Sequence, residues 1–138
     1  MCNFMHNDSV PIKKSGKGWK IFEKPQLSWI KLKPMAQLNA RPYPINESII
    51  WEDYLFQPMY DQIENKNEKG FCFFLTRKEA QRCFDDWVYN HNCIIRRIEY
   101  KQGLGKHNEN GISGSHLYYL VALTKEFKIL PIKGDKIM

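Results

Sequence analysis

The pattern of hydrophobic and polar positions is clearest over residues 70–100, where it predicts a strand, a helix and a second strand. Residues 71–75 contain no polar side chain, as is typical of a strand buried on both faces. Hydrophobic residues then recur at the spacing of one helical face, at Ala80, Cys83, Phe84, Trp87 and Val88. Residues 93–100 return as the second strand, so this stretch supplies the centre of a folded core.

The start of the predicted helix is marked by Thr76, which lies three residues before Glu79. This is the spacing of a capping box, in which the threonine hydroxyl accepts from the Glu79 N–H and the glutamate reaches back. The polar residues 90–92 suit a helix exit, so the helix is predicted over residues 77–90.

Further strands are predicted over residues 18–23, 28–33, 117–123 and 127–130, and a strand-like segment over 49–56. Three prolines exclude a long regular element from residues 34–46. Residues 61–69 are predicted to be a polar loop, and residues 101–116 a long glycine-bearing loop. The chain therefore divides into an arm (1–17), one domain (18–132) and a frayed tail (133–138).

The predicted fold class is α+β. We expect a mostly antiparallel sheet or partly closed barrel of five to six strands, with one main helix packed on it.

Composition narrows the class of protein. Of the 138 residues, 43% are hydrophobic and 14% aromatic, which excludes a disordered chain. No apolar run approaches the roughly 18 residues that span a bilayer, and the first ten residues lack a signal-peptide pattern. We therefore expect a cytoplasmic protein without a membrane partner. The net charge of +6 favours an anionic partner: a nucleotide, a nucleic acid or an acidic protein surface.

Cysteine and histidine spacing gives no pattern of a metal site. Cys72, Cys83 and Cys93 lie in the hydrophobic unit and are expected to be reduced core thiols. His91 and Cys93 have some ligand character, but no second pair accompanies them, so neither a metal nor a cofactor is expected.

Arg96 is the first candidate binding residue. Alternation places it on the same strand face as Ile94 and Ile98, where an unpaired guanidinium is costly. It either pairs with an internal carboxylate, for which Glu52 and Asp53 are candidates, or lines a pocket for an anion.

The long loop supplies the next candidates. Its glycines allow close approach of a ligand to the backbone, and its polar side chains can contact phosphate oxygens: Lys106, His107, Ser113, Ser115 and His116. It is not a P-loop, because the required glycine and lysine spacing is absent. The alternative is a flexible hairpin loop.

Two tryptophans complete the set of candidates. Trp19 and Trp29 have lysines beside them and can stack on bases if they are exposed, or belong to the core if they are not.

Several motifs together resemble a group of small uncharacterised proteins from bacteria and their phages. These motifs are the Met1-Cys2 start, the segment Gly-Trp-Lys-Ile-Phe at 18–22, the segment Gly-Phe-Cys-Phe-Phe-Leu-Thr-Arg-Lys-Glu-Ala at 70–80, and the basic strand at 94–98. The resemblance covers about half of the chain. It implies a phage or prophage accessory role, including counter-defence, and no catalytic residue.

The leading hypothesis is a small basic binding module for an anionic ligand or partner. Two alternatives remain. One is a small enzyme that uses Cys2, His107 or His116 on a nucleotide or acyl substrate, because an N-terminal cysteine can be a nucleophile with its own amine as base. The other is a protein-interaction inhibitor that acts through its surface.

Overall fold

The computed structural model describes residues 5–24, 31–34, 42–54, 68–87, 90–110, 118–133 and 135. Over these ranges the chain forms antiparallel strands, one α-helix and two short 3-10 helices. The strands are β1 (Ser15–Glu23), β2 (Lys31–Pro34), β3 (Tyr43–Pro44), β4 (Ile49–Ile50), β5 (Phe71–Phe73), β6 (Cys93–Asn110) and β7 (Tyr118–Ile129). The helices are η1 (Trp51–Tyr54), α2 (Arg77–Asp86) and η2 (Asn90–Asn92).

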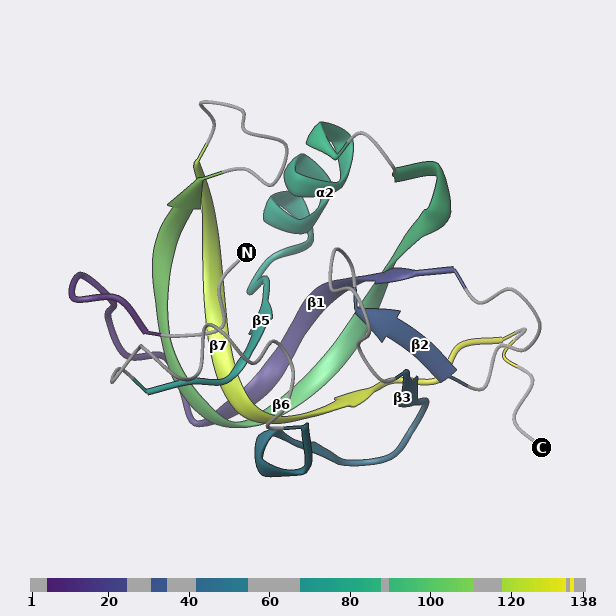
Figure 1. The fold of residues 1–138 in the computed structure, drawn as a ribbon, viewed down its shortest axis with the longest axis horizontal. Coiled ribbons are helices and arrows are strands. Elements are labelled where there is room, and N and C mark those ends of the chain that lie inside the picture. Colours follow the sequence, from purple (N-terminus) through teal and green to yellow (C-terminus); the bar gives the residue numbers. More distant parts are fainter. Residues whose placement is uncertain are drawn as a thin grey trace.

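The strands form one sheet in the order β3-β2-β1-β6-β7-β4, and β5 also pairs with β7. All of the pairings between these strands are antiparallel. Figure 1 shows β6 and β7 as a long bent hairpin, with α2 between the two raised ends of β6. The predicted α+β fold, a mostly antiparallel sheet with one main helix packed on it, is confirmed.

The sheet curls without closing. Phe74, directly after β5, exchanges two backbone hydrogen bonds with Trp19 of β1, of 2.8 and 2.7 Å. This single bridge brings the start of α2 beside β1. Gly18 allows the approach, because a Cβ there would lie only 2.6 Å from the Phe73 ring.

The start of α2 is as predicted, but its end is earlier. The Thr76 hydroxyl accepts from the Glu79 N–H at 3.3 Å. The Glu79 carboxylate contacts Arg82 and accepts from the Leu120 N–H, so the capping box is one-sided. The helix ends at Asp86 because the backbone of Trp87 is extended.

Two hydrophobic clusters fill the two sides of the sheet. One contains Phe22, Phe73 and Phe127, and β2, β3 and β4 contribute Leu32, Tyr43 and Ile49 to it. The other contains Ile21, Val121 and Leu123 and packs against α2 through Ala80 and Cys83. Trp87, predicted to be core, is only half-buried at the edge of this second cluster.

The predicted loop over residues 101–116 is wrong for its first ten residues. Residues 101–110 continue β6 and pair with β7 from Glu126 to Tyr118. A bulge between Gly103 and Gly105 and a positive φ of 57° at Gln102 turn the strand there. The two strands predicted over 117–123 and 127–130 are the single strand β7. Repeated pairing with a neighbouring strand thus outweighs the low strand propensity of the glycines.

The N-terminal segment is docked on the sheet. Val10 and Lys106 exchange two backbone hydrogen bonds of 2.9 and 2.8 Å, and the Gly103 N–H donates to the Lys14 carbonyl at 2.9 Å. We call residues 5–14 the N-terminal segment. β1 begins at Ser15, three residues earlier than predicted, and the predicted strand-like segment at 49–56 is short β4 followed by η1. None of the helices in the described ranges is long and apolar enough to cross a membrane.

Candidate functional site

Arg96 is a buried ion-pair residue. Its side chain and that of Asp135 are each 3% exposed, and its two terminal nitrogens bond both Asp135 carboxylate oxygens at 3.1 and 2.7 Å. The Leu130 carbonyl accepts a further bond at 2.9 Å. Of the two alternatives posed by the sequence, the structure has the internal pair, with Asp135 in place of Glu52 or Asp53 as its partner.

The other predicted binding residues are not gathered at one place. Lys106 is half-buried on β6 and His107 is buried beside it on the opposite face of the strand. Ser113, Ser115, His116 and Trp29 lie outside the described residues.

Trp19 lies in a cluster of basic side chains. The guanidinium carbons of Arg77 and Arg97 each lie 5.3 Å from the centroid of the Trp19 ring. Trp19 is half-buried, whereas both arginines are exposed. The ring is therefore in contact with two cations, an arrangement that cation–π attraction stabilises by about 0.5–1 kcal/mol per contact at exposed sites. We call these three residues the Trp–Arg cluster.

The backbone explains why these three side chains meet. Arg97 is the direct cross-strand partner of Trp19 in the β1–β6 ladder, and opposite residues point to the same side of a sheet. Arg77 follows three residues after Phe74, which is bridged to Trp19. The sequence identified Trp19 but missed both arginines, because Arg97 fell on an ordinary polar strand face and Arg77 in the first turn of a helix.

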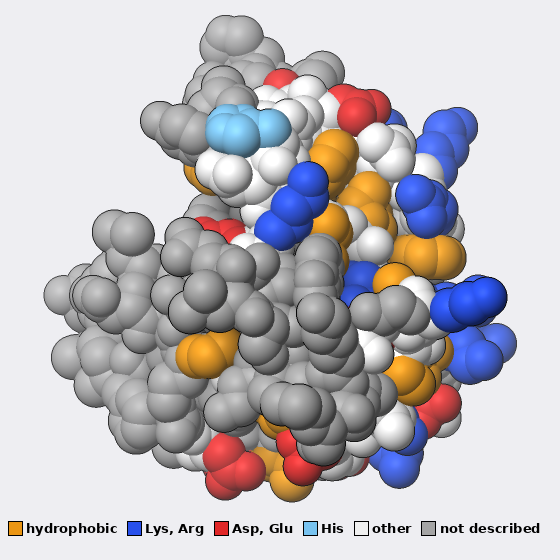
Figure 2. Space-filling view, turned by 90° about the vertical axis from the view of Figure 1, so that its right-hand side faces the viewer, with side chains coloured by type: hydrophobic (Ala, Val, Ile, Leu, Met, Phe, Trp, Pro, Cys, Tyr) orange, Lys and Arg blue, Asp and Glu red, His pale blue; other side chains and the backbone are white. Residues whose placement is uncertain are grey.

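Neither arginine of the Trp–Arg cluster forms an ion pair with a carboxylate in the described part of the chain. Arg82, on the same helix as Arg77, contrasts with them because it bonds both Glu79 oxygens at 3.1 and 3.2 Å. Lys17 faces Glu99 across the strand pair, which offsets part of its charge. Figure 2 shows one face of the molecule on which several Lys and Arg side chains lie beside hydrophobic ones at the surface.

A second polar cluster joins the N-terminal segment to β6. The Nε2 atoms of His6 and His107 lie 3.1 and 2.9 Å from the same Glu109 oxygen, Oε1. The two imidazole rings are stacked, with centroids 3.8 Å apart. The Ser9 hydroxyl lies 3.2 Å from His107 Nδ1. Because His107 and Glu109 are two residues apart on β6, both point to the same side of the sheet. We call His6, His107 and Glu109 the His–Glu cluster.

Only His107 of the His–Glu cluster was proposed as a site residue from the sequence. His6 was considered only as one of several possible metal ligands, and Glu109 was missed, because no local spacing links them to His107. Ser9 and His107, for example, are 98 residues apart in the chain.

Lys20 is a buried cation on the face of β1 opposite to Trp19. Its ammonium group donates to the Cys72 carbonyl and lies 5.9 Å from the centroid of the Phe22 ring. Burial lowers the pKa of Lys20, since desolvation disfavours its charged form. Burial likewise raises the pKa of Cys72 to about 11 and that of Cys83 to about 12. Both thiols therefore stay protonated and are poor nucleophiles at neutral pH.

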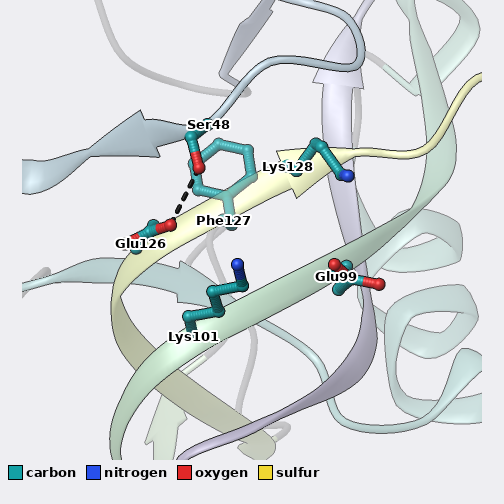
Figure 3. A pocket seen from close by; sticks show the side chains of 6 residues that line it. All are labelled: Ser48, Glu99, Lys101, Glu126, Phe127 and Lys128. Atoms are coloured by element: carbon teal, nitrogen blue, oxygen red, sulfur yellow. Dashed lines mark hydrogen bonds between the residues drawn. The ribbon is translucent and has the colours of Figure 1, made fainter.

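A small hollow lies over the β6–β7 ladder near Ser48. Figure 3 shows Ser48 bonded to Glu126 at one side, with Lys101 directed toward the centre. Its volume is about 30 Å³, room for a water molecule and far below the several hundred Å³ of a nucleotide-sized pocket. Glu99 with Lys128, and Lys101 with Glu126, are direct cross-strand partners of opposite charge, which explains their presence without a ligand.

Comparison of the chain with protein-family models, with curated proteins and with solved structures gave no match. The resemblance to small phage proteins therefore stays a prediction.

Proposed function

We propose that this chain is a binding module for an anionic polymer, and that the polymer is a nucleic acid. The observation that carries the proposal is the Trp–Arg cluster, in which one tryptophan ring holds two exposed arginines that pair with no carboxylate among the described residues. Each guanidinium is exposed and held beside the ring, so each can donate charge-assisted hydrogen bonds to an anionic group such as a phosphate.

Nucleic acid is favoured over a free nucleotide by the shape of the surface. Both arginines of the cluster are exposed, and Trp19 is half-buried beside them. A free nucleotide needs a concave site that encloses most of its surface, whereas a strand gains affinity from many exposed contacts. Arginine planes and aromatic rings are also the groups on which unpaired bases stack.

The net charge of +6 adds to the proposal, because summed positive charge attracts a polyanion over a distance. We propose a cytoplasmic location, since Cys83 and Cys93 are buried cysteines outside any disulfide, of the kind that a reducing compartment preserves. A phage or prophage accessory role agrees with this proposal.

The test is the binding of a fluorescently labelled single-stranded oligonucleotide, followed by anisotropy between about 50 and 200 mM salt. We expect the affinity to fall as salt rises. Arg77→Gln and Arg97→Gln should each weaken binding and reduce the slope of log affinity against log salt by about one contact.

Arg82→Gln is the matched control. It removes the same charge from the same helix, but from a guanidinium that already bonds Glu79. Equal loss in all three variants would mean that only net charge matters and would contradict a localised site. Failure to bind the oligonucleotide, together with binding of polyglutamate that depends on Arg77 and Arg97, would assign the surface to an acidic protein instead.

A further inference from the structure

We propose that the His–Glu cluster is a binding site for a divalent transition-metal ion, with Zn²⁺ as the expected occupant. The inference is independent of the Trp–Arg cluster and departs from the expectation drawn from residue spacing. Its basis is the convergence of two imidazole nitrogens and one carboxylate oxygen, each group able to give one ligand atom, with all three atoms within 4.8 Å of one another.

The donor set is one that zinc uses. Two histidines and one glutamate supply nitrogen and oxygen ligands of the type found at zinc sites with three protein ligands. Neutral imidazole also suits copper, iron and nickel, so these ions are expected to bind as well, in the usual order of affinity of first-row divalent metals. Calcium and magnesium are disfavoured because they take oxygen ligands.

Two of the ligand-atom separations are close to those of a metal site. A tetrahedral ion with bonds near 2.0–2.1 Å separates its ligand atoms by roughly 3.3 Å. The two nitrogen–oxygen distances in the cluster are 3.1 and 2.9 Å. The two imidazole rings are stacked, 22° from parallel, so binding an ion requires the rings to turn until both Nε2 atoms point at it.

The remaining ring nitrogen of His107 already has a partner. Its Nδ1 lies 3.2 Å from the Ser9 hydroxyl, which can accept an N–H from the ring when Nε2 binds the metal. Ligating histidines are usually oriented by such a contact. Ser9 is itself held in a turn, because its hydroxyl accepts from the His6 N–H at 2.8 Å and its N–H donates to the His6 carbonyl at 3.1 Å.

The site is open on one side. The His107 and Glu109 side chains are 0% and 7% exposed, whereas His6 is 30% exposed. An ion can thus enter past His6 and keep a water in its fourth position. Since His6 belongs to the N-terminal segment and the other two ligands to β6, a bound metal would also fasten that segment to the sheet.

The experiment is a titration of the full, metal-stripped chain with Zn²⁺ alone, followed by calorimetry and by elemental analysis after desalting. We expect one Zn²⁺ per chain and a raised melting temperature, because a ligand that binds only the folded state stabilises it. His6→Ala and Glu109→Gln should each weaken binding by tenfold or more, and Ser9→Ala by a smaller factor.

His91→Ala is the matched control, since His91 is an exposed histidine on η2 away from the cluster. It should bind Zn²⁺ as the unmodified chain does. The proposal is overturned if the unmodified chain shows no saturable binding, if His6→Ala binds equally well, or if His91→Ala loses as much. Should Glu109→Gln fail to fold by circular dichroism, the exposed His6→Ala variant decides the question.

Discussion

The two ends of β6 each bury a charged side chain, and each of these charges holds a segment from a distant part of the sequence. Near the start of the strand, Arg96 bonds Asp135, which follows β7 in the chain. Near its end, Glu109 contacts His6 of the N-terminal segment and His107 of its own strand. The same strand thus holds Asp135 through a buried cation, Arg96, and the N-terminal segment through a buried carboxylate, Glu109.

The two contacts differ in what can change them. A guanidinium is charged at any pH a protein survives, and the Arg96–Asp135 pair is bidentate and only 3% exposed. The imidazole nitrogens opposite Glu109 can bind a metal ion, and His6 remains 30% exposed. The Arg96–Asp135 pair is therefore expected to stay formed whenever the chain is folded, whereas a metal ion can alter the contacts of the His–Glu cluster.

The largest effect is expected from Arg96→Met. Removing one partner of a buried pair leaves the Asp135 carboxylate without its cation, which costs about 3–5 kcal/mol of unfolding free energy. Urea melts monitored by circular dichroism would measure it. A loss below about 1 kcal/mol would show that water solvates the Asp135 carboxylate in the variant. The Arg96–Asp135 pair would then contribute no more to stability than the His–Glu cluster.

In the metal-free chain, Glu109→Gln should lower the free energy of unfolding by less than Arg96→Met does. The amide keeps an oxygen acceptor for the two imidazoles and loses only the charge, so we expect about 1.5–3 kcal/mol. The same urea melt gives the value. A larger loss than that of Arg96→Met would reverse the comparison and make the His–Glu cluster the main structural anchor.

Gly103→Ala tests the docking of the N-terminal segment without touching a charge. A Cβ at this position would lie only 2.4 Å from the Lys13 carbonyl and 2.9 Å from the Tyr100 ring, so the segment must shift. We expect a loss of about 1–3 kcal/mol from overpacking. A neutral result in the melt would mean that the segment is easily displaced from β6.

The smallest effect concerns local opening and not global stability. His6→Ala should leave the melt nearly unchanged but speed hydrogen exchange at the Val10 and Lys106 amides, which bond each other's carbonyls. The Leu130 amide, which donates to Arg97 at the other end of the strand, is the internal control. Equal exchange changes at both ends would contradict independent anchoring.

Local chemistry made part of this fold predictable. The Thr76 cap, the helical stripe through Ala80 and Cys83, and the buried strand β5 follow from short-range spacing, and all three are present. Strand alternation also indicated that Arg96 either pairs with an internal carboxylate or lines an anion pocket; the structure has the pair, with Asp135 as a partner that the sequence did not identify.

The rest depended on contacts between distant residues. Gly103 and Gly105 suggested a loop, and only pairing with β7 on one side and the N-terminal segment on the other makes this stretch a strand. The approach of Arg77 to Trp19 depends on the Trp19–Phe74 bridge, and that of His6 to Glu109 on the docking of the N-terminal segment. No periodicity within a window of residues carries that information.

The pairing of β1 with β6 has a kinetic consequence. The β6–β7 hairpin joins neighbouring strands, whereas β1 reaches β6 only after the roughly 70 residues between them have been closed into a loop. Closing long loops slows folding, so we expect the β6–β7 hairpin to form first. β1 should then join late, together with the N-terminal segment and Asp135. Contacts that form after the transition state act on the unfolding rate. Arg96 and Glu109 would then determine how long the native state persists and have little influence on how fast it is reached.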